Sequence, residues 1–234
     1  MKKLSDDAAR VYSQHGEDGI IARIFETIGV SSRVCIEFGA WDGLFFSNTA
    51  HLWKNGWKAI LIEADQERYR ELVQNTTGYD CYCINAHVCD EGDGMLENIL
   101  KAHHLPLEAD FLSIDIDGDD YFILASLQGL RPRVIACECN RTLPAHGGGA
   151  PRKGGFFGSS PQSLARLAAT KGYRFVAMTD TNCFFVTDRD GPKFSGYDTS
   201  LEPLATGKRI RYLARGYARW LVHKLRKTCP GRSG

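Results

Sequence analysis

Residues 33–38 have the pattern of a buried strand and run directly into a glycine turn, Gly39-Ala40-Trp41-Asp42-Gly43. Twenty residues further on, a second apolar strand ends on Glu63. Glycine lets the backbone pass close to a ligand, and an acid at the tip of the next strand can accept hydrogen bonds from both hydroxyl groups of a ribose. Together these features predict a nucleoside-binding site.

The turn lacks the fingerprint of a dinucleotide site, which needs three glycines in the order G-x-G-x-x-G. Trp41 and Asp42 stand where a pyrophosphate would need bare backbone N–H groups, and Asp42 would repel that anion. A cofactor with a ribose and no phosphate fits better. S-adenosylmethionine (SAM) is such a cofactor, and Glu37 and Asp42 suit its ammonium and sulfonium charges.

Length and composition predict one globular domain. The chain has 234 residues, 43% of them hydrophobic, without an internal repeat. No run approaches the roughly 20 apolar residues of a membrane span, and the N-terminus lacks the apolar core of a signal peptide. We therefore expect a cytoplasmic protein.

The eight cysteines are expected to be free thiols, because several lie in apolar strand-like runs and a core of this size needs no disulfides. Cys81, Cys83, His87 and Cys89 are of the types that bind zinc. Strand alternation explains the first two as small half-buried residues, and we prefer that interpretation.

Apolar strands alternate with amphipathic segments along the chain. The predicted strands are residues 33–38, 58–63, 80–85, 111–116, 133–139, 173–178 and 182–187. The predicted helices are residues 44–54, 66–75, 92–103, 120–128 and 160–171, and an earlier helix capped by Ser13 and ended by Gly29. Alternation of this kind indicates a mostly parallel sheet with helices on both faces.

The last two strands are too close in sequence for a crossover helix, so the final strand must run antiparallel. We therefore expect an α/β fold with a seven-stranded sheet, the Rossmann-like arrangement of a class I methyltransferase.

Acidic side chains follow the fourth and fifth predicted strands. Alternation puts Asp115 and Asp117 on one face, and Glu138 and Asn140 form a second same-face pair. Neighbouring carboxylates are costly without a nearby cation. Oxygen ligands suit Mg²⁺, which acidifies a hydroxyl while a neighbouring acid removes its proton. We predict Asp117 as the general base and Asp115, Glu138 and Asn140 as a candidate Mg²⁺ site.

Other polar residues near these sites have two interpretations. Asp119 and Asp120 stand at a predicted helix start, where acids are favourable without any catalytic role. Gln14 and His15 precede the first helix and either lie on the surface or line the site, with His15 a second catalytic candidate. Residues 141–158, rich in glycine and carrying His146, Arg152 and Lys153, are either a lid or an unstructured loop.

These motifs in combination resemble the FkbM/TylF-type SAM-dependent methyltransferases associated with polysaccharide and natural-product glycosylation. The resemblance covers roughly residues 11–188. It rests on Ser13-Gln-His-Gly-Glu-Asp18, Glu37-Phe-Gly-Ala-Trp-Asp-Gly43, Ser47-Asn-Thr49, Ile62-Glu63, Ser113-Ile-Asp-Ile-Asp-Gly118, Glu138-x-Asn140 and Asn182-x-Phe-Phe185. It implies methyl transfer from SAM to a hydroxyl, usually on a sugar. Metal-dependent members carry acids that correspond to Asp115, Asp117 and Glu138, and some carry Asp where Asn140 stands.

The expected SAM contacts are Gln14, Glu37, Gly39, Ala40, Asp42, Gly43, Asn48, Glu63, Ala64, Asn85, Ala86 and Asp115. Two other functions remain open, an NAD(P)-dependent oxidoreductase and a non-catalytic SAM-fold binding or scaffold protein. A nucleic-acid acceptor is not expected, because the core is acidic and no Asn/Asp-Pro-Pro-Tyr segment follows the fourth strand.

Residues 208–234 form a basic tail after the expected methyltransferase domain, residues 1–207. The tail carries nine Lys or Arg residues and no acid. Arg211, Arg215 and Arg219 share one helical stripe, opposite an aromatic and aliphatic stripe. Such a helix either lies on anionic lipid at the inner membrane surface or packs on the domain; nucleic acid is a further alternative.

Overall fold

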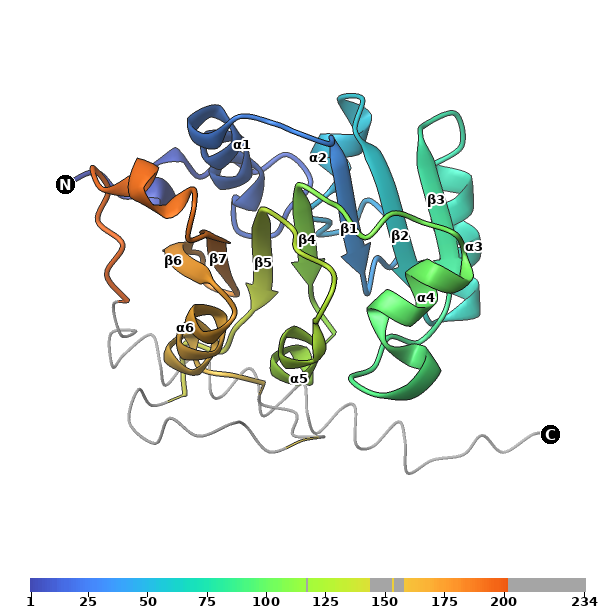
Figure 1. Ribbon diagram of the computed structural model, residues 1–234. Coiled ribbons are helices and arrows are strands. Elements are labelled where there is room, and N and C mark those ends of the chain that lie inside the picture. The colour runs from blue at the N-terminus through green and yellow to red at the C-terminus, as the bar shows by residue number, and fades with distance from the viewer. Residues whose placement is uncertain (117, 144–152, 154–157, 202–234) are drawn as a thin grey trace.

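One seven-stranded sheet organises the chain (Figure 1), in the strand order β3-β2-β1-β4-β5-β7-β6. The computed structural model describes residues 1–116, 118–143, 153 and 158–201. The strands are β1 (Val34–Phe38), β2 (Lys58–Glu63), β3 (Cys81–Asn85), β4 (Phe111–Ile114), β5 (Val134–Glu138), β6 (Tyr173–Met178) and β7 (Asn182–Thr187). Only β7 runs antiparallel to its neighbours, so the predicted fold class is confirmed.

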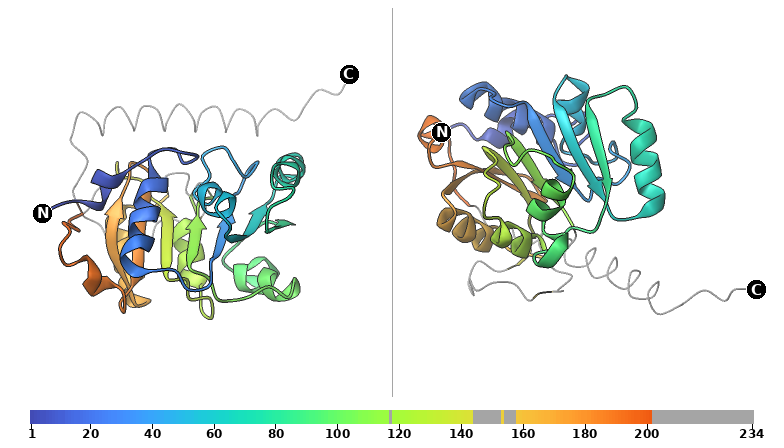
Figure 2. Two further views of the ribbon diagram at one scale, coloured as in Figure 1. Left: turned by 90° about the horizontal axis from the view of Figure 1, so that it is seen from above. Right: turned by 45° about the vertical axis from the view of Figure 1, so that its right-hand side comes forward.

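Helices cover both faces of the sheet (Figures 1 and 2), and each face has its own apolar core. The helices are α1 (Glu17–Ile28), α2 (Ala50–Lys54), α3 (Gln66–Asn75), α4 (Leu96–Ala102), α5 (Asp120–Ser126) and α6 (Pro161–Thr170). Short 3₁₀ turns are η1 (Leu4–Asp7), η2 (Gly92–Gly94) and η3 (Gly191–Phe194). Strand alternation sends Ile60 and Ile62 toward α4–α6, and Ala59 and Leu61 toward α1–α3.

Three predicted element boundaries are wrong, each because a side chain binds the backbone. The predicted helix 44–54 is helical only over Ala50–Lys54. The cap of α1 is Gly16 rather than Ser13, although the Ser13 hydroxyl does accept the N–H of Asp18 (3.1 Å). Strand β4 ends at Ile114, so Asp115 lies beyond the strand. Strand alternation therefore does not determine on which face Asp115 lies.

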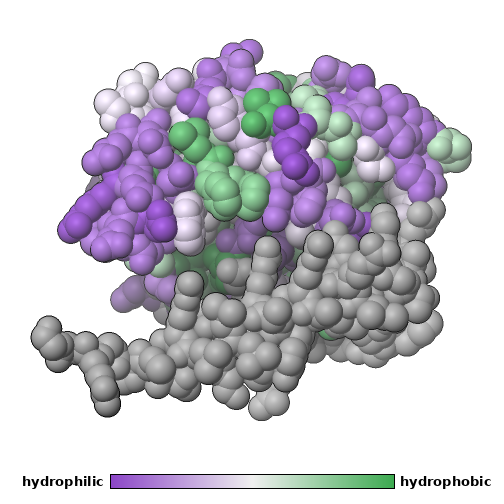
Figure 3. Space-filling model, turned by 180° about the vertical axis from the view of Figure 1, so that it is seen from behind, coloured by the Kyte–Doolittle hydropathy of each residue, from purple (hydrophilic) through white to green (hydrophobic). Residues whose placement is uncertain are grey.

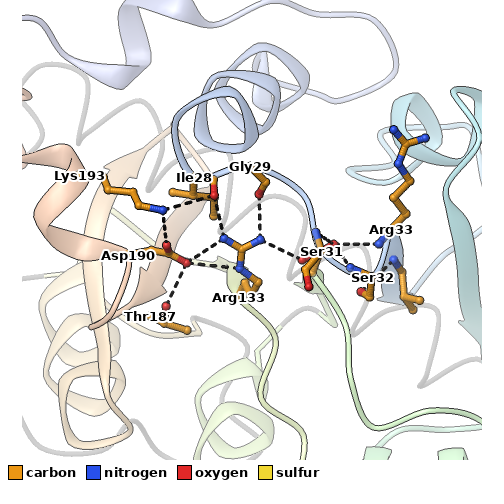
Figure 4. Close-up of polar contacts among 11 residues, drawn as sticks. Ile28, Gly29, Ser31, Ser32, Arg33, Arg133, Thr187, Asp190 and Lys193 are labelled. Carbon is orange, nitrogen blue, oxygen red and sulfur yellow. Dashed lines mark hydrogen bonds and ion pairs between the residues drawn. The ribbon is translucent and has the colours of Figure 1, made fainter.

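A buried ion-pair cluster ties the amino ends of the strands together (Figure 4). Asp110, which directly precedes β4, accepts three backbone N–H groups from residues 31–33, at 2.7–2.9 Å. Arg133, before β5, contacts Asp110 (3.3 Å) and Asp190 (3.0 Å) and donates to two carbonyl groups at the end of α1. Burial acts to raise the pKa of Asp190, but hydrogen bonds from Lys193 and Arg133 outweigh it and hold the pKa below its usual value.

No helix in the described part of the chain is long and apolar enough to cross a membrane. The basic tail, residues 208–234, and most of the expected lid lie outside the described residues. All seven described cysteines are free thiols, in agreement with the sequence prediction.

Candidate functional site at the carboxyl edge

The strand order reverses direction between β1 and β4, which are neighbours at the centre of the sheet. Open α/β sheets bind ligands in the crevice beyond the carboxyl ends of the strands at such a switch point. The turn after β1 and the acidic segment after β4 both begin there. The topology therefore brings the predicted cofactor turn and the predicted acids to the same edge.

Three carboxylates hold the backbone of the turn after β1. Glu63 accepts the N–H of Trp41 (2.8 Å), Asp42 those of Leu44 (2.9 Å) and Phe45 (2.7 Å), and Glu37 that of Asn48 (2.8 Å). Carbonyl oxygens accept the N–H groups of Ala40, Gly43 and Ser47. The turn therefore has an acidic lining, and protein oxygens already accept these seven N–H groups.

Glu37 organises the segment that follows the turn. Its carboxylate also accepts hydrogen bonds from the hydroxyl groups of Ser47 and Thr49, both at 2.6 Å. Burial raises its pKa, and the hydrogen bonds from Ser47 and Thr49 oppose that rise. Asn48, held in this way, reaches Ser113 on β4 through its side-chain amide (3.0 Å). These contacts explain why residues 44–49 do not form the predicted helix.

Glu63 links the turn to the ends of β2 and β3. Its second carboxylate oxygen accepts the N–H of Asp65 (2.7 Å), and its side chain is almost fully buried. The Asn85 amide donates to the carbonyl groups of Glu63 (2.8 Å) and Ala64 (3.2 Å), and the Ala86 N–H also donates to Glu63. A carboxylate offers about four lone-pair sites, so Glu63 retains capacity for hydroxyl donors.

Gly39 and Gly43 are needed for packing within the protein as well as for any ligand. Both have positive φ angles, +70° and +82°. A Cβ at Gly39 would overlap the carbonyl oxygen of Asp115, and one at Gly43 would lie 2.7 Å from a methyl group of Leu72. The clash at Gly39 would be with a backbone atom, which cannot move aside as a side chain can. Only a glycine at position 39 therefore lets the turn contact the segment after β4.

Exposed aromatic side chains cluster on the turn. Trp41, Phe45 and Phe46 are 45%, 58% and 45% exposed. On the face seen from behind, the surface is mostly hydrophilic and has small hydrophobic patches (Figure 3). Trp41 and Phe46 have left-handed backbone conformations, with φ of +53° and +57°. Such conformations are strained for bulky residues and cluster at functional sites. Arg68 stacks over the Trp41 ring, 4.4 Å from its centroid.

The segment after β4 wraps around Asp120, which is almost fully buried. Its carboxylate accepts the N–H groups of Ile116 (2.9 Å) and Gly118 (3.0 Å). Asp120 therefore shapes the backbone on both sides of residue 117, a structural role that differs from the helix-start role expected for it. Asp117 itself, the predicted base, lies outside the described residues.

The candidate Mg²⁺ ligands at the end of β5 are not all available. Glu138 ends the strand and pairs in register with Asn182. The side-chain oxygen of Asn140 already accepts both the N–H and the hydroxyl of Thr142, which occupy its two lone pairs. Asn140 in this arrangement does not fit a metal-ligand role. Within the described residues, no three His, Cys, Asp or Glu side chains gather as metal ligands.

Two buried acids at the start of α1 fix the loop that carries Gln14 and His15. Asp18 accepts the N–H groups of residues 11, 12 and 13, each at 2.9 Å, and the Ser13 hydroxyl at 2.7 Å. Glu17 accepts the N–H of His15 (2.6 Å) and the hydroxyl of Thr179 after β6 (2.6 Å). Glu17 and Asp18 are 0% and 2% exposed. The sequence analysis did not predict this role of Asp18. The feature that could have indicated it is the position of an acid in the first turn of a helix.

A pairing between Ser13 and Phe46 places this loop beside the turn after β1. Residues 9–16, hereafter the α1 entry loop, thus join the other predicted site residues at the carboxyl edge.

Of the cationic residues expected on the lid, Lys153 is described, and its ammonium group pairs with Asp90 (2.9 Å).

No family model matches the chain, and a search of curated proteins found no match. Among solved structures, one described as a pericyclic reaction enzyme has a TM-score of 0.44 and 12% identity, covering 70% of this chain and 46% of that one. Monomeric WbdD has a TM-score of 0.45 and 16% identity, covering 79% and 43%. The glycopeptide N-methyltransferase MtfA, complexed with SAM, has a TM-score of 0.41 and 14% identity, covering 78% and 93%.

The chain thus spans less than half the length of the first two structures. Similarity at these TM-scores does not assign a function to the present chain.

Proposed function

We propose that this protein is a SAM-dependent O-methyltransferase that acts on a hydroxyl group of a sugar or glycan, with Asp117 as general base. The observation that carries the proposal is the acidic lining of the turn at the switch point. Glu37, Asp42 and Glu63 direct carboxylates to its backbone, at 2.7–2.9 Å. SAM brings a ribose and two cationic groups, which such a lining favours.

The same contacts disfavour a nicotinamide cofactor. A pyrophosphate needs free N–H groups, usually at a helix start directly after the glycine turn. Here the first helix after β1 begins at Ala50, and carboxylates bind the N–H groups of Trp41, Leu44 and Phe45. A pyrophosphate at this turn would face carboxylates that already hold these N–H groups.

In the proposed reaction the acceptor oxygen bonds to the methyl carbon of SAM as the carbon–sulfur bond breaks. The bonding electrons pass to sulfur, leaving a neutral thioether, and the hydroxyl proton passes to Asp117. The proposal contains no metal step, because Asn140 is engaged by Thr142. If EDTA abolished activity and Mg²⁺ restored it, the reaction would require a divalent metal ion after all.

Calorimetric titration tests the cofactor directly. SAM and S-adenosylhomocysteine should bind the full-length protein, whereas NADH and NADPH should give no saturable heat. Tight binding of a nicotinamide cofactor would overturn the proposal. A protein that binds SAM but transfers no methyl group to any member of a broad hydroxyl panel would instead be a binding subunit.

Replacing Glu63 by alanine should weaken SAM binding by about 10–100-fold, the loss of one or two charge-assisted hydrogen bonds to the ribose. Asp65→Ala is a matched control. It removes a neighbouring carboxylate that caps α3 by accepting the N–H groups of Glu67 and Arg68. The control should lower stability by about 1 kcal/mol and leave SAM affinity within about threefold. Equal SAM affinity in Glu63→Ala and the wild-type protein would contradict the ribose assignment.

A further inference from the structure

A cavity of about 440 Å³ lies beside the α1 entry loop. It is lined by η1, by Arg10 and His15 of that loop, by the end of β6 and by Arg141 beyond β5. Its volume falls within the usual range of small-molecule sites. Because β6 is antiparallel to β7 and β7 to β5, β6 ends at the same edge as the central strands. The cavity therefore opens at the edge where the fold binds ligands.

The cavity is separate from the predicted cofactor turn but adjacent to it. Glu37, Asp42 and Glu63 are not among its lining residues. The α1 entry loop connects the two places, since Ser13 pairs with Phe46 of the turn while Arg10 and His15 line the cavity. A molecule in the cavity would thus lie next to a cofactor bound at the turn, as an acceptor must.

The unbalanced charge in the cavity is positive. Its two carboxylates are already paired, Asp198 with Lys3 (3.6 Å) and Asp180 with Arg141 (3.0 Å). Arg10 is exposed and forms no ion pair with the described residues. Arg141 makes one hydrogen bond to the described residues although its guanidinium has five N–H donors. The Arg10 charge and the remaining N–H donors of Arg141 can therefore bind an anion.

The loop that presents Arg10 and His15 is rigidly held, which suits a binding role. Asp18 fixes its middle through three backbone N–H groups, and Glu17 joins it to the β6–β7 turn through Thr179. Burying two carboxylates is costly unless hydrogen bonds compensate, and here they order a short loop. Sites held by such a supporting shell are preorganised for their ligand.

We propose that this cavity receives an anionic group, a phosphate or a carboxylate, of the methyl acceptor, held by Arg10 and Arg141 beside His15. The inference rests on the proposed function, since it assigns the cavity to the acceptor of that reaction. In this arrangement the two ligands bind at places of opposite charge, the cationic cofactor at the acidic turn and the anionic acceptor in the basic cavity.

Inorganic phosphate and acetate are the probes, titrated into the full-length protein at constant ionic strength. Both should perturb the NMR signals of the His15 ring, identified by their loss in His15→Asn. Arg10→Ala should weaken this response at least about tenfold, because it removes a charge-assisted contact. If phosphate binds more tightly than acetate, the anionic group of the acceptor is a phosphate. If acetate binds more tightly, that group is a carboxylate.

Arg166→Ala is the matched control. Arg166 is exposed on α6, and α6 packs on the face of the sheet opposite to that covered by α1. It should bind the probes as the wild-type protein does. Arg141→Lys, which keeps the charge toward Asp180, should weaken the response less than Arg141→Gln. No shift of the His15 signals, or equal shifts in Arg10→Ala and wild type, would overturn the inference.

SAM titration of the same samples separates this inference from the proposed function. SAM binding without a phosphate or acetate response would defeat the cavity assignment alone. A response without SAM binding would defeat the methyltransferase and with it the assignment of the anion to an acceptor.

Discussion

Replacing Asp110 by alanine is expected to lower the free energy of unfolding by about 3–5 kcal/mol, the usual cost of breaking a buried ion pair. The Asp110 carboxylate is fully buried and holds the loop between α1 and β1 through three backbone N–H groups. Its removal leaves those donors without their acceptor and Arg133 without one of its two carboxylates. For a chain of this size, the melting temperature should fall by about 6–20 °C.

Chemical denaturation and thermal melting measure this loss, with Asp65→Ala as the control. Asp65 also accepts two backbone N–H groups, but at an exposed helix start, where a cap contributes about 1 kcal/mol. Asp110→Asn should fall between the two, since it keeps one acceptor and loses the charge. If Asp110→Ala cost no more than Asp65→Ala, the cluster in Figure 4 would not be a major source of stability.

The strands were predictable because their pattern depends on burial alone. Both faces of the sheet are covered, so β2 reads as a continuous apolar run, Ala59-Ile60-Leu61-Ile62, which any strand at the centre of such a sheet requires. The antiparallel β7 followed from the short turn after β6. Local rules were sufficient for these elements.

The errors lie where side chains distant in sequence bind the backbone. Residues 44–54 were predicted as one amphipathic helix, but Glu37 and Asp42 accept N–H groups of residues 44–48 and Phe46 has a positive φ angle. Likewise, β4 ends early because the Asp120 carboxylate binds the N–H of Ile116. Hydrophobic periodicity carries no information about such bonds.

The candidate site shows the same division. The sequence predicted that the turn after β1 and the segment after β4 meet at the carboxyl edge, because parallel strands end together there. It did not show that Glu63 and Glu37 would bind the turn itself, at 2.8 Å from Trp41 and Asn48. Nor did it show the cavity beside His15, which η1, β6 and the segment after β5 form together.

Replacing Asp117 by asparagine should lower turnover by about 10²–10⁴-fold and leave SAM affinity nearly unchanged. That range is the usual contribution of general acid–base catalysis. The expectation comes from the sequence, since Asp117 follows the strand that ends at the switch point, and Asp120 fixes the N–H groups on either side of it. Release of S-adenosylhomocysteine on an acceptor found by screening gives turnover, and calorimetry gives SAM affinity.

Asp119→Asn is the matched control, an acid two residues further on that stands at the start of α5 and has no proposed part in proton transfer. It should retain turnover within about threefold of the wild-type protein, because removing a charge near a helix start changes stability by about 1 kcal/mol or less. Equal losses in both variants would indicate that the segment needs its acids for folding rather than for proton transfer. A fully active Asp117→Asn would move the base elsewhere, and His15 in the adjacent cavity would be the next residue to replace.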